Sequence, residues 1–565
     1  MNQSRVFLLI AWLMVATLLW MEWGKEQQVA RMPAAPVASV QPVPQMVPGQ
    51  VPQAGNNVPA APGTQNAAMP ATAAAGNRVE VRTDVLHLTL GGGSVVEAEL
   101  LKYPQTRDAG SAPVKLFNAD NNKLYSAQSG WVGQNGSKAP NHLQFQPVEP
   151  GKQYVLGEGQ SSISIPFVWE DGAGLKLTRT YTLKRDSYVV EVSDEVHNSG
   201  ETPWSGYIYR QLVRVPPQIE ASMFHPESYS FNGATWWDGD YERRPFKDFL
   251  DDGKINQTVE GGWLAMLQHH FFTAWIPQKD QSALYTLDQQ GVLSAIAATG
   301  PQFSLAPGQK AETRARLWVG PKLVDKIAAE NVKGLDRAVD YSRFSVFAVL
   351  GQGLFWVLST LHGWIGNWGW AIIGLVCLLR ILMFPLSSAQ FKSAAKMRKF
   401  QPRLQQLKER YGDDRQKFQQ AMMELYRTEK INPMAGCLPI IPQMLIFMTL
   451  YWVLSEAVEL RHAPWVGWIH DLTARDPYFI LPALNAAIML ATQHLTPMAP
   501  GMDPMQQRMF KLMPLIFGAI LAFLPSGLVL YQVANGGLSL LQQWYMLKKH
   551  GEAPGKATFI PKDKK

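Results

Sequence analysis

The spacing of hydrophobic and polar positions divides the chain into two parts. From Asn77 to about Pro321, several stretches alternate apolar and polar residues. Ile163, Ile165 and Phe167 are an example, and such alternation predicts β-strands that bury one face. Beyond Pro321 the apolar residues form long uninterrupted runs, which predict helices that cross a membrane.

The first part of the chain predicts a large antiparallel sandwich. Turn sequences occur at Trp169–Gly174 and Lys184–Ser187. The runs that follow them, Leu175–Leu183 and Tyr188–Val196, keep a period of two, which is typical of consecutive hairpins. So many strands in succession favour a sandwich over a small barrel. We interpret the alternating apolar positions as core packing and not as a ligand stripe.

The apolar runs predict six membrane spans, one near the N-terminus and five in the second part of the chain. They are Val6–Met21, Trp368–Leu386, Cys437–Leu454, Tyr478–Leu495, Met509–Leu524 and Gly527–Leu547. A cleaved signal peptide is the alternative for the first run, but no small-x-small cleavage site follows it closely, which favours an uncleaved anchor. The span before Pro525 is short, as suits a locally thinned bilayer.

These patterns divide the chain into six segments. They are an anchor (1–24), a Pro/Ala-rich disordered linker (25–76), the β domain (77–322), connecting and interfacial amphipathic helices (323–367), a core of five transmembrane helices with a hairpin at 390–430 (368–547), and a basic tail (548–565). Leu323–Asp340 predicts one connecting helix. Tyr341–Leu361 is either a seventh span or an amphipathic helix on the membrane surface, and room for a turn at Gly363–Gly369 favours the second.

Positive charge predicts the orientation of the spans. The chain has a net charge of +7, and Gln390–Lys430 carries eleven basic residues against five acidic ones. The tail from Lys548 is also rich in lysine. The positive-inside rule places both segments in the cytosol, and six spans then place the β domain outside.

The composition argues against covalent or metal chemistry. The two cysteines, Cys377 and Cys437, lie in or beside apolar runs, so the β domain has no disulfide framework. The sequence contains no GxxxxGK[ST] loop, no HExxH motif and no dense His/Cys cluster. We therefore expect no cofactor, no metal and no catalytic residues.

Arg380 is the one charged residue in the run Trp368–Leu386. It follows Trp368 by 12 positions, which is about 18 Å into a hydrocarbon layer about 30 Å thick. An arginine at this depth costs roughly 2.5–3.5 kcal/mol on insertion scales, so its presence indicates a function. Arg380 either extends to the inner headgroups or, as we favour, lies in a water-filled cavity that handles charge inside the membrane.

Polar residues of the other spans are candidates to line the same cavity. They are Gln443, Asn485, Gln493, Gln532, Asn535 and Ser539. In a helix bundle such residues usually form interhelical hydrogen bonds, and the sequence does not show that they face one another. The spans contain no Asp or Glu of the kind that proton or cation transporters use.

The segment Gln390–Lys430 predicts a helical hairpin. One apolar stripe follows Met397, Phe400, Leu404, Leu407 and Tyr411, and continues through Phe418, Met422 and Leu425. Gly412 is expected to end the first helix, and Asp413 or Asp414 to cap the second. The hairpin is either a solvated spacer between two spans or a docking arm for incoming chains. The candidate docking residues are Lys396, Arg398, Lys399, Arg403, Lys408 and Arg410.

Several motifs of the second part occur in a specific order. They are Arg380-Ile-Leu-Met-Phe-Pro-Leu-Ser-Ser-Ala-Gln, Lys396-Met-Arg, Gln401-Pro402, Asn432-Pro433, Gly436-Cys437-Leu-Pro439, Gln443-Met444, Trp468-Ile-His-Asp471, Asp503-Pro-Met-Gln-Gln507 and Pro525-Ser-Gly-Leu-Val-Leu-Tyr531. Together they closely resemble the YidC membrane-protein insertase family, over about Trp368–Leu547. The outer half matches more loosely. An anchor followed by a large outer domain is similar to the Gram-negative form, whose domain is a β-super-sandwich like those of sugar mutarotases.

The resemblance implies that the five core spans enclose a hydrophilic groove, open to the cytosol and the lipid and closed on the outer side. Arg380 matches the groove arginine of the family, and clients are expected to slide along the spans of Arg380, Gln443 and Tyr531. The candidate groove residues are Arg380, Gln443, Tyr531, Gln532, Asn485 and Asn535. Two positions depart from the family pattern, since Leu445 stands where a proline is frequent and Gln532 replaces a second tyrosine.

A member of this family would insert membrane proteins and help them to fold in the bacterial inner membrane, without covalent catalysis. The implied partners are nascent membrane proteins, the Sec translocon, ribosome and signal-recognition-particle components, and lipids, with the monomer as the functional form. The large domain would be periplasmic and the C-terminus cytosolic. The alternatives are a polytopic transporter or channel and a sugar-active enzyme. The acid/base residues of such an enzyme would come from His225, His269, His270, Glu170 and Glu220.

Overall fold

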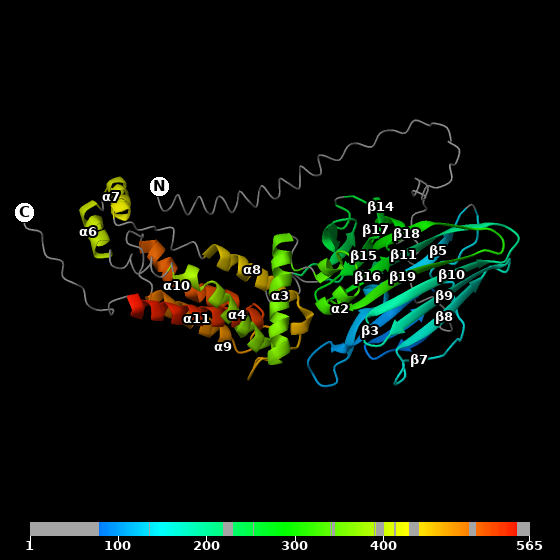
Figure 1. Cartoon of the computed structure of the whole chain (residues 1–565), viewed down its shortest axis with the longest axis horizontal. Coiled ribbons are helices and arrows are strands. Elements are labelled where there is room, and N and C mark those ends of the chain that lie inside the picture. The colour runs from blue at the N-terminus through cyan, green and yellow to red at the C-terminus, as the bar shows by residue number, and fades with distance from the viewer. Residues whose placement is uncertain are drawn as a thin grey trace, which may run out of the picture.

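The computed structural model describes residues 78–134, 136–218, 230–251, 253–339, 341, 345–388, 390, 401–411, 414–428, 440–495 and 504–550. A β domain lies at one end of the molecule and a bundle of helices at the other (Figure 1). The predicted anchor (1–24), the linker (25–76) and the tail beyond His550 lie outside the described residues.

Two β-sheets, counted over these residues, form the β domain. The first consists of β1 (Arg78–Arg82), β2 (Leu86–Gly91), β3 (Ser94–Pro104), β4 (Pro113–Phe117), β5 (Tyr125–Gly133), β7 (Tyr154–Val155), β11 (Trp204–Arg214), β14 (Asn256–Glu260), β17 (Ser282–Gln290) and β18 (Leu293–Leu305). Their order is β14-β17-β18-β11-β5-β3-β2-β1-β7, with β4 paired to β3.

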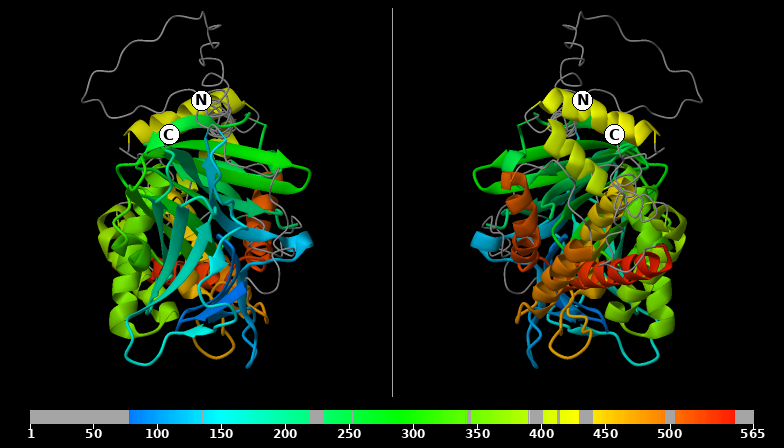
Figure 2. Two further views of the ribbon diagram at one scale, coloured as in Figure 1. Left: turned by 90° about the vertical axis from the view of Figure 1, so that its right-hand side faces the viewer. Right: turned by 90° about the vertical axis from the view of Figure 1, so that its left-hand side faces the viewer.

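The second sheet lies against the first and shares its core (Figure 2). It consists of β6 (Gln146–Pro147), β8 (Ser162–Glu170), β9 (Leu175–Lys184), β10 (Val189–Asn198), β12 (Gly233–Trp237), β13 (Tyr241–Pro245), β15 (Trp263–Leu267), β16 (Phe271–Pro277) and β19 (Lys310–Pro321). Their order is β13-β12-β15-β16-β19-β10-β9-β8-β6. The predicted sandwich is confirmed, and so are the two hairpins that join β8, β9 and β10.

One inward position of β9 carries a charge. Arg179 stands in the buried stripe of this strand, opposite Asp194 of β10. Its Nε donates to an Asp194 carboxylate oxygen at 2.6 Å, and another nitrogen donates to the Ser129 backbone oxygen at 2.6 Å. Trp131 Nε1 donates to Asp194 at 2.9 Å. Because each charged group has several partners, the pair can stay buried between the sheets.

One strand pairing departs from the antiparallel pattern of the sandwich, and one predicted detail of the connecting segment is wrong. The pairing of β1 with β7 is parallel, because the chain returns to the sheet edge after a long excursion and not through a hairpin. The connecting segment Leu323–Asp340 is not one helix but α2 (Val324–Ala329) and the 3-10 helix η6 (Leu335–Val339). Asn331 and Gly334 separate them with positive φ angles of 53° and 75°. A side chain at Gly334 would overlap the Trp237 ring, so the chain comes close to the β domain there.

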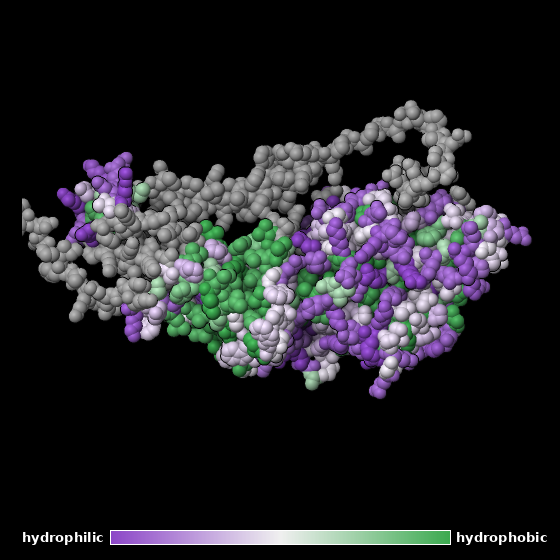
Figure 3. Space-filling view, in the orientation of Figure 1, coloured by the Kyte–Doolittle hydropathy of each residue, from purple (hydrophilic) through white to green (hydrophobic). Residues whose placement is uncertain are grey.

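The second part of the chain is helical. Its helices are α3 (Ser345–Ile365), α4 (Trp368–Leu382), α6 (Gln401–Tyr411), α7 (Arg415–Thr428), α8 (Ile440–Glu456), the 3-10 helix η8 (Val458–Leu460), α9 (Ile480–Leu495), α10 (Pro504–Leu521) and α11 (Ser526–His550). α11 packs on α4, α8 and α9, and α10 packs on α9. The surface of this bundle is strongly hydrophobic, whereas that of the β domain is largely hydrophilic (Figure 3).

The structure does not confirm six membrane spans. Among the described residues, Val346–Ile365 of α3 is the one stretch long and apolar enough to qualify as a span by length and composition, and Trp368–Leu382 and Ile480–Leu495 are shorter apolar helices. The helices α4, α8 and α9 are too short to qualify as spans by length, because they have 15, 17 and 16 residues. Yet α3, the segment expected at the membrane surface, lies crosswise between the bundle and the β domain (Figure 1).

Candidate functional site

Arg380, in the last turn of α4, is held by α11. Its Nε donates to the Asn535 side-chain oxygen at 2.8 Å. A terminal nitrogen donates to the Asn535 backbone oxygen at 2.9 Å. That carbonyl can accept the second bond in mid-helix because a carbonyl oxygen has two lone pairs. Asn535 therefore fixes the guanidinium group at two points.

Two cavities meet at Arg380 and Asn535. The larger one has a volume of about 350 Å³. Its lining residues are Arg380, Ile488, Met489, Thr492, Gln493, Phe510, Met513, Pro514, Asn535, Gly536 and Ser539. The smaller one, of about 10 Å³, is lined by Val376, Leu379, Arg380, Met383, Gln443, Ile446, Tyr531 and Asn535. The site thus places one cation and several amide and hydroxyl groups among apolar side chains.

Gln443 and Tyr531 connect α8 to α11 beside the arginine. The Gln443 side-chain amide donates to the Tyr531 hydroxyl oxygen at 3.1 Å. The Phe447 ring, one turn further along α8, stacks on the Tyr531 ring with centroids 6.5 Å apart. Sequence reasoning placed Gln443, Tyr531, Arg380 and Asn535 in one site, and the structure brings these four together.

The other two candidate groove residues are not among the residues that line these two cavities. Asn485 is buried, and its amide points to Met489 Sδ at 3.6 Å rather than to Arg380. Gln532 lines neither of the two cavities. It lies one helical turn before Asn535, nearer the outer end of α11, where the helix is packed. A groove role for Asn485 and Gln532 therefore stays a prediction.

One face of α9 contributes lining residues that the polar pattern missed. Ile488 and Thr492 are four positions apart on this helix, as are Met489 and Gln493, so all four residues lie on one face. The Thr492 hydroxyl donates to the Ile488 backbone oxygen at 2.8 Å. Met489 could have been found from its spacing of four positions to Gln493, since residues at such a step share one face of a helix.

A compact loop between α8 and α9 packs against the beginnings of α4 and α11. The Trp465 ring lies against Gly369 at the start of α4, and the Asn367 amide donates to the Pro464 backbone oxygen at 3.1 Å. Further along, the Gly527 N–H donates to the Leu472 backbone oxygen at 2.9 Å. The loop is therefore bonded to the first turns of both α4 and α11, and we name residues 463–474 the outer plug.

Gly369→Ala tests how tightly this plug is packed. A Cβ at position 369 would overlap the Trp465 ring, so we expect the free energy of unfolding to fall by about 1–3 kcal/mol. Thermal unfolding of the purified chain in detergent measures the change. Gly353→Ala in α3 is the matched control, because a Cβ there meets nothing within 4 Å. Equal unfolding temperatures for the two variants would contradict the close packing.

The predicted cytosolic hairpin is present as α6 and α7, at the end of the bundle far from the β domain (Figure 1). Its apolar stripe packs together through Leu404, Leu407, Met422, Leu425 and Tyr426. Asp414 caps α7, since its carboxylate accepts the Gln416 and Lys417 N–H groups at 3.2 and 3.1 Å. These bonds lower the pKa of the Asp414 carboxyl.

The candidate docking residues are only partly described. Arg403 is exposed on α6, and the Arg410 guanidinium lies 5.6 Å from the centre of the Tyr411 ring. Lys396, Arg398 and Lys399 lie outside the described residues, as does the side chain of Lys408.

Comparison with known proteins covers the whole chain. Residues 78–357 match the family described as "YidC periplasmic domain", and residues 360–553 match "60Kd inner membrane protein". A "Membrane protein insertase YidC" of Stenotrophomonas maltophilia (strain R551-3) is 60% identical over 99% of both chains. One of Xanthomonas campestris pv. campestris is 57% identical over 98% of this chain and 99% of the relative.

The chain belongs to the YidC family of membrane protein insertases. Its predicted family is confirmed, and as a YidC chain it is a non-enzymatic inner-membrane protein with a periplasmic domain. Among solved structures, a YidC insertase crystal structure is 19% identical and covers 85% of this chain and 98% of its own, with a TM-score of 0.35. A galactose mutarotase-like protein of Clostridium acetobutylicum covers 43% and 94%, is 10% identical and has a TM-score of 0.29. Both scores are below 0.5, so the assignment depends on the sequence relatives.

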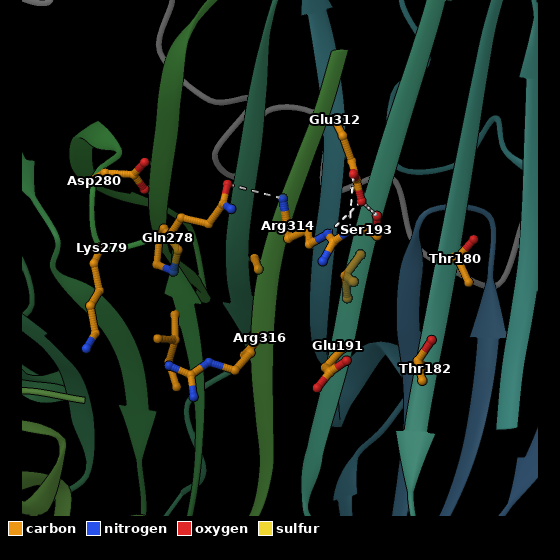
Figure 4. Close-up of a pocket in the computed structure, with 14 residues that line it drawn as sticks. Thr180, Thr182, Glu191, Ser193, Gln278, Lys279, Asp280, Glu312, Arg314 and Arg316 are labelled. Atoms are coloured by element: carbon orange, nitrogen blue, oxygen red, sulfur yellow. Dashed lines mark hydrogen bonds and ion pairs between the residues drawn. The ribbon is translucent and has the colours of Figure 1, made fainter. Parts of the chain in front are cut away.

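The YidC periplasmic domain has a shallow trough of about 740 Å³ on the outward face of β9, β10 and β19 (Figure 4). The Arg314 guanidinium and the Ser193 hydroxyl donate to Glu312 and lower the pKa of its carboxyl. A general acid needs a raised pKa, so Glu312 does not suit that role.

The described acid/base candidates for a sugar-active enzyme lie outside this trough. Glu170 pairs with Lys176, and His269 and His270 face the helical bundle. Glu220 and His225 lie outside the described residues.

Proposed function

We propose that this chain inserts the apolar segments of membrane proteins into the lipid through the cavity at Arg380. The observation that carries the proposal is a guanidinium group fixed at two points by Asn535 and lining a cavity of about 350 Å³ between helices with apolar outer surfaces. Two of the five N–H groups of Arg380 donate to Asn535. The others can donate to an acidic or polar group of an arriving client.

The cavity would act by lowering the desolvation cost of the outer segment of a client. Moving an unpaired polar group into an apolar environment costs about 2–7 kcal/mol, depending on the reference state. Water, Arg380 and the amides of Gln443 and Asn535 would replace part of its hydration. The apolar span of the client then partitions into lipid, driven by burial of its apolar surface, so no nucleotide hydrolysis is required.

The proposed membrane arrangement has α4, α8, α9, α10 and α11 as spans, with an N-terminal anchor as the sixth. The crosswise placement of α3 supports its assignment to the outer surface (Figure 1). Its exposed Trp356 and Trp364, 70% and 80% accessible, suit the headgroup region, where tryptophan is enriched. The basic hairpin and tail are then cytosolic by the positive-inside rule.

The proposed partners follow from this arrangement. Nascent membrane proteins are the clients, and the basic hairpin at the far end of the bundle from the β domain supports a docking role for them. We include the Sec translocon, ribosome and signal-recognition-particle components, and surrounding lipids as partners, with the monomer as the working unit. Positive charge in the hairpin and tail would attract ribosomal RNA.

Reconstitution tests whether the chain works alone. Purified protein in liposomes is expected to insert a small single-spanning client well above the level of protein-free liposomes, as measured by protease protection of the client. Liposomes with an unrelated multi-span protein control for non-specific defects. Absence of insertion, with recovery only when the Sec translocon is added, would instead favour a translocon-dependent chaperone.

A further inference from the structure

The β domain and the helical bundle meet at the outer end of α8. Lys322 follows the last residue of β19, and Glu456 is the last residue of α8. The Lys322 ammonium nitrogen lies 3.2 Å from a Glu456 carboxylate oxygen. The two side chains are 0% and 3% exposed, so this ion pair is shielded from water.

A buried ion pair of this kind favours one relative orientation of the two parts. Removing one partner from such a pair leaves an uncompensated buried charge, which costs about 3–5 kcal/mol. The position also suits a cation, because the peptide dipoles of α8 place partial negative charge at its C-terminus. Lys322 therefore interacts with both the Glu456 carboxylate and the helix end.

Two histidines of the β domain cap the same helix end. The last carbonyls of a helix have no partners within it. His269 Nε2 lies 2.8 Å from the Ser455 backbone oxygen. His270 Nδ1 lies 3.4 Å from the Glu456 backbone oxygen. Carbonyl oxygens only accept, so both rings donate, and burial lowers the pKa of His270 and keeps that ring neutral.

The loop after α8 adds contacts to the β domain. Arg461 donates to the backbone oxygens of Pro104 and Gln105 at 2.8 and 3.1 Å. The Val324 N–H, at the start of α2, donates to the Glu459 carboxylate at 3.4 Å. The end of α8 and the loop after it are thus held by residues of β3 and α2 and by the residues next to β16 and β19.

The same helix carries Gln443 of the groove. Gln443 lies 13 positions before Glu456, about 20 Å along the helix axis. Because a helix is stiff over this length, a tilt at its outer end moves Gln443 relative to α11. The Gln443–Tyr531 bond of 3.1 Å would lengthen or break after such a movement.

We propose that Lys322 and Glu456 are positioning residues for insertion, acting through α8. Their ion pair and the histidine caps hold the α8 wall of the groove at a set distance from α11. The periplasmic domain then takes part in insertion through this junction. The inference rests on the proposed insertase function and adds to it two residues about 20 Å from Gln443.

The test is Glu456→Gln in the full-length chain, with spin labels at Met448 of α8 and Leu541 of α11 after both natural cysteines are replaced. Both label sites are exposed, at 38% and 61%. We expect the distance distribution between the labels to broaden and client insertion into liposomes to slow about fivefold. The exchange Lys322→Glu with Glu456→Lys is expected to restore a narrow distribution and much of the rate, because the ion pair can form again.

Glu195→Gln is the matched control, since it breaks an exposed pair with Lys310 on the same domain. It should leave distances and rate unchanged. Unchanged distances in Glu456→Gln, or broadened distances with the wild-type insertion rate, overturn the inference. If Glu456→Gln does not fold, His269→Ala takes its place, because it removes a helix cap but no ion pair. The label distances and the insertion rate are then measured for that variant. The distance measurement needs no client. If the wild type inserts no client, the insertase proposal fails, and the label distances still test the positioning role on its own.

Discussion

Arg380→Ala is expected to slow the insertion of clients with acidic outer segments by about tenfold or more in liposomes. A carboxylate at the membrane centre costs roughly 2.5–3.5 kcal/mol, and loss of about 1.4 kcal/mol of compensation already gives a tenfold effect. Arg380→Lys should lose less, because it keeps the charge. It should still lose some activity, since a single ammonium group cannot reproduce the two-point contact with Asn535.

Client charge is the control for this experiment. A client whose outer segment is neutral should depend much less on Arg380, and Asn535→Ala should fall between the wild type and Arg380→Ala, because it keeps the cation but removes one anchor. Protease-protection time courses at two salt concentrations measure the rates. Normal insertion of every client by Arg380→Ala would show that the electrostatic mechanism is wrong.

Asp194→Ala should have the largest effect on stability. The substitution leaves the fully buried Arg179 without its carboxylate and Trp131 Nε1 without its acceptor. Breaking a buried ion pair costs about 3–5 kcal/mol. For a domain of this size, such a loss lowers the thermal midpoint of unfolding by about 10 °C. Circular dichroism of the strand signal in the full-length chain measures the shift.

An exposed pair of the same sheet provides the comparison. Lys184→Met breaks the pair with Glu191, whose side chains are largely accessible, and should change the free energy of unfolding by less than about 1 kcal/mol. The double variant Arg179→Met with Asp194→Leu should recover part of the loss, because neither member of this pair then stays buried as a charge without its partner. A midpoint for Asp194→Ala within a degree of the wild type would mean that the pair contributes nothing to folding.

The β domain was largely predictable because strand alternation is a local signal. The period of two and the turn at Lys184–Ser187 define β9, β10 and their register. That register also places Arg179 opposite Asp194, although an arginine in a buried stripe contradicts the usual pattern of composition. The parallel pairing of β1 with β7 has no comparable local signal, since it depends on where a long connection returns.

The groove was only partly predictable because helix faces are harder to assign. Arg380 could be identified from its isolation, but its partner Asn535 lies 155 positions away. Gln532, Asn535 and Ser539 share one helical face by spacing, yet the cavity begins only at Asn535, because the outer part of α11 is packed. Composition alone also identifies α3 as a span, whereas its crosswise placement depends on its neighbours.

The outer plug has a consequence for the energy metabolism of the cell. A water-filled cavity that reached both faces of the inner membrane would conduct protons and discharge the gradient that drives ATP synthesis. The Trp465 ring lies against Gly369 and the plug is bonded to the first turn of α11, whereas Arg380 and Asn535 of the cavity lie further along α4 and α11. Apolar constrictions exclude water and ions. On the proposed function, a hydrophilic groove of partial depth would therefore need no gate in a membrane that must remain electrically tight.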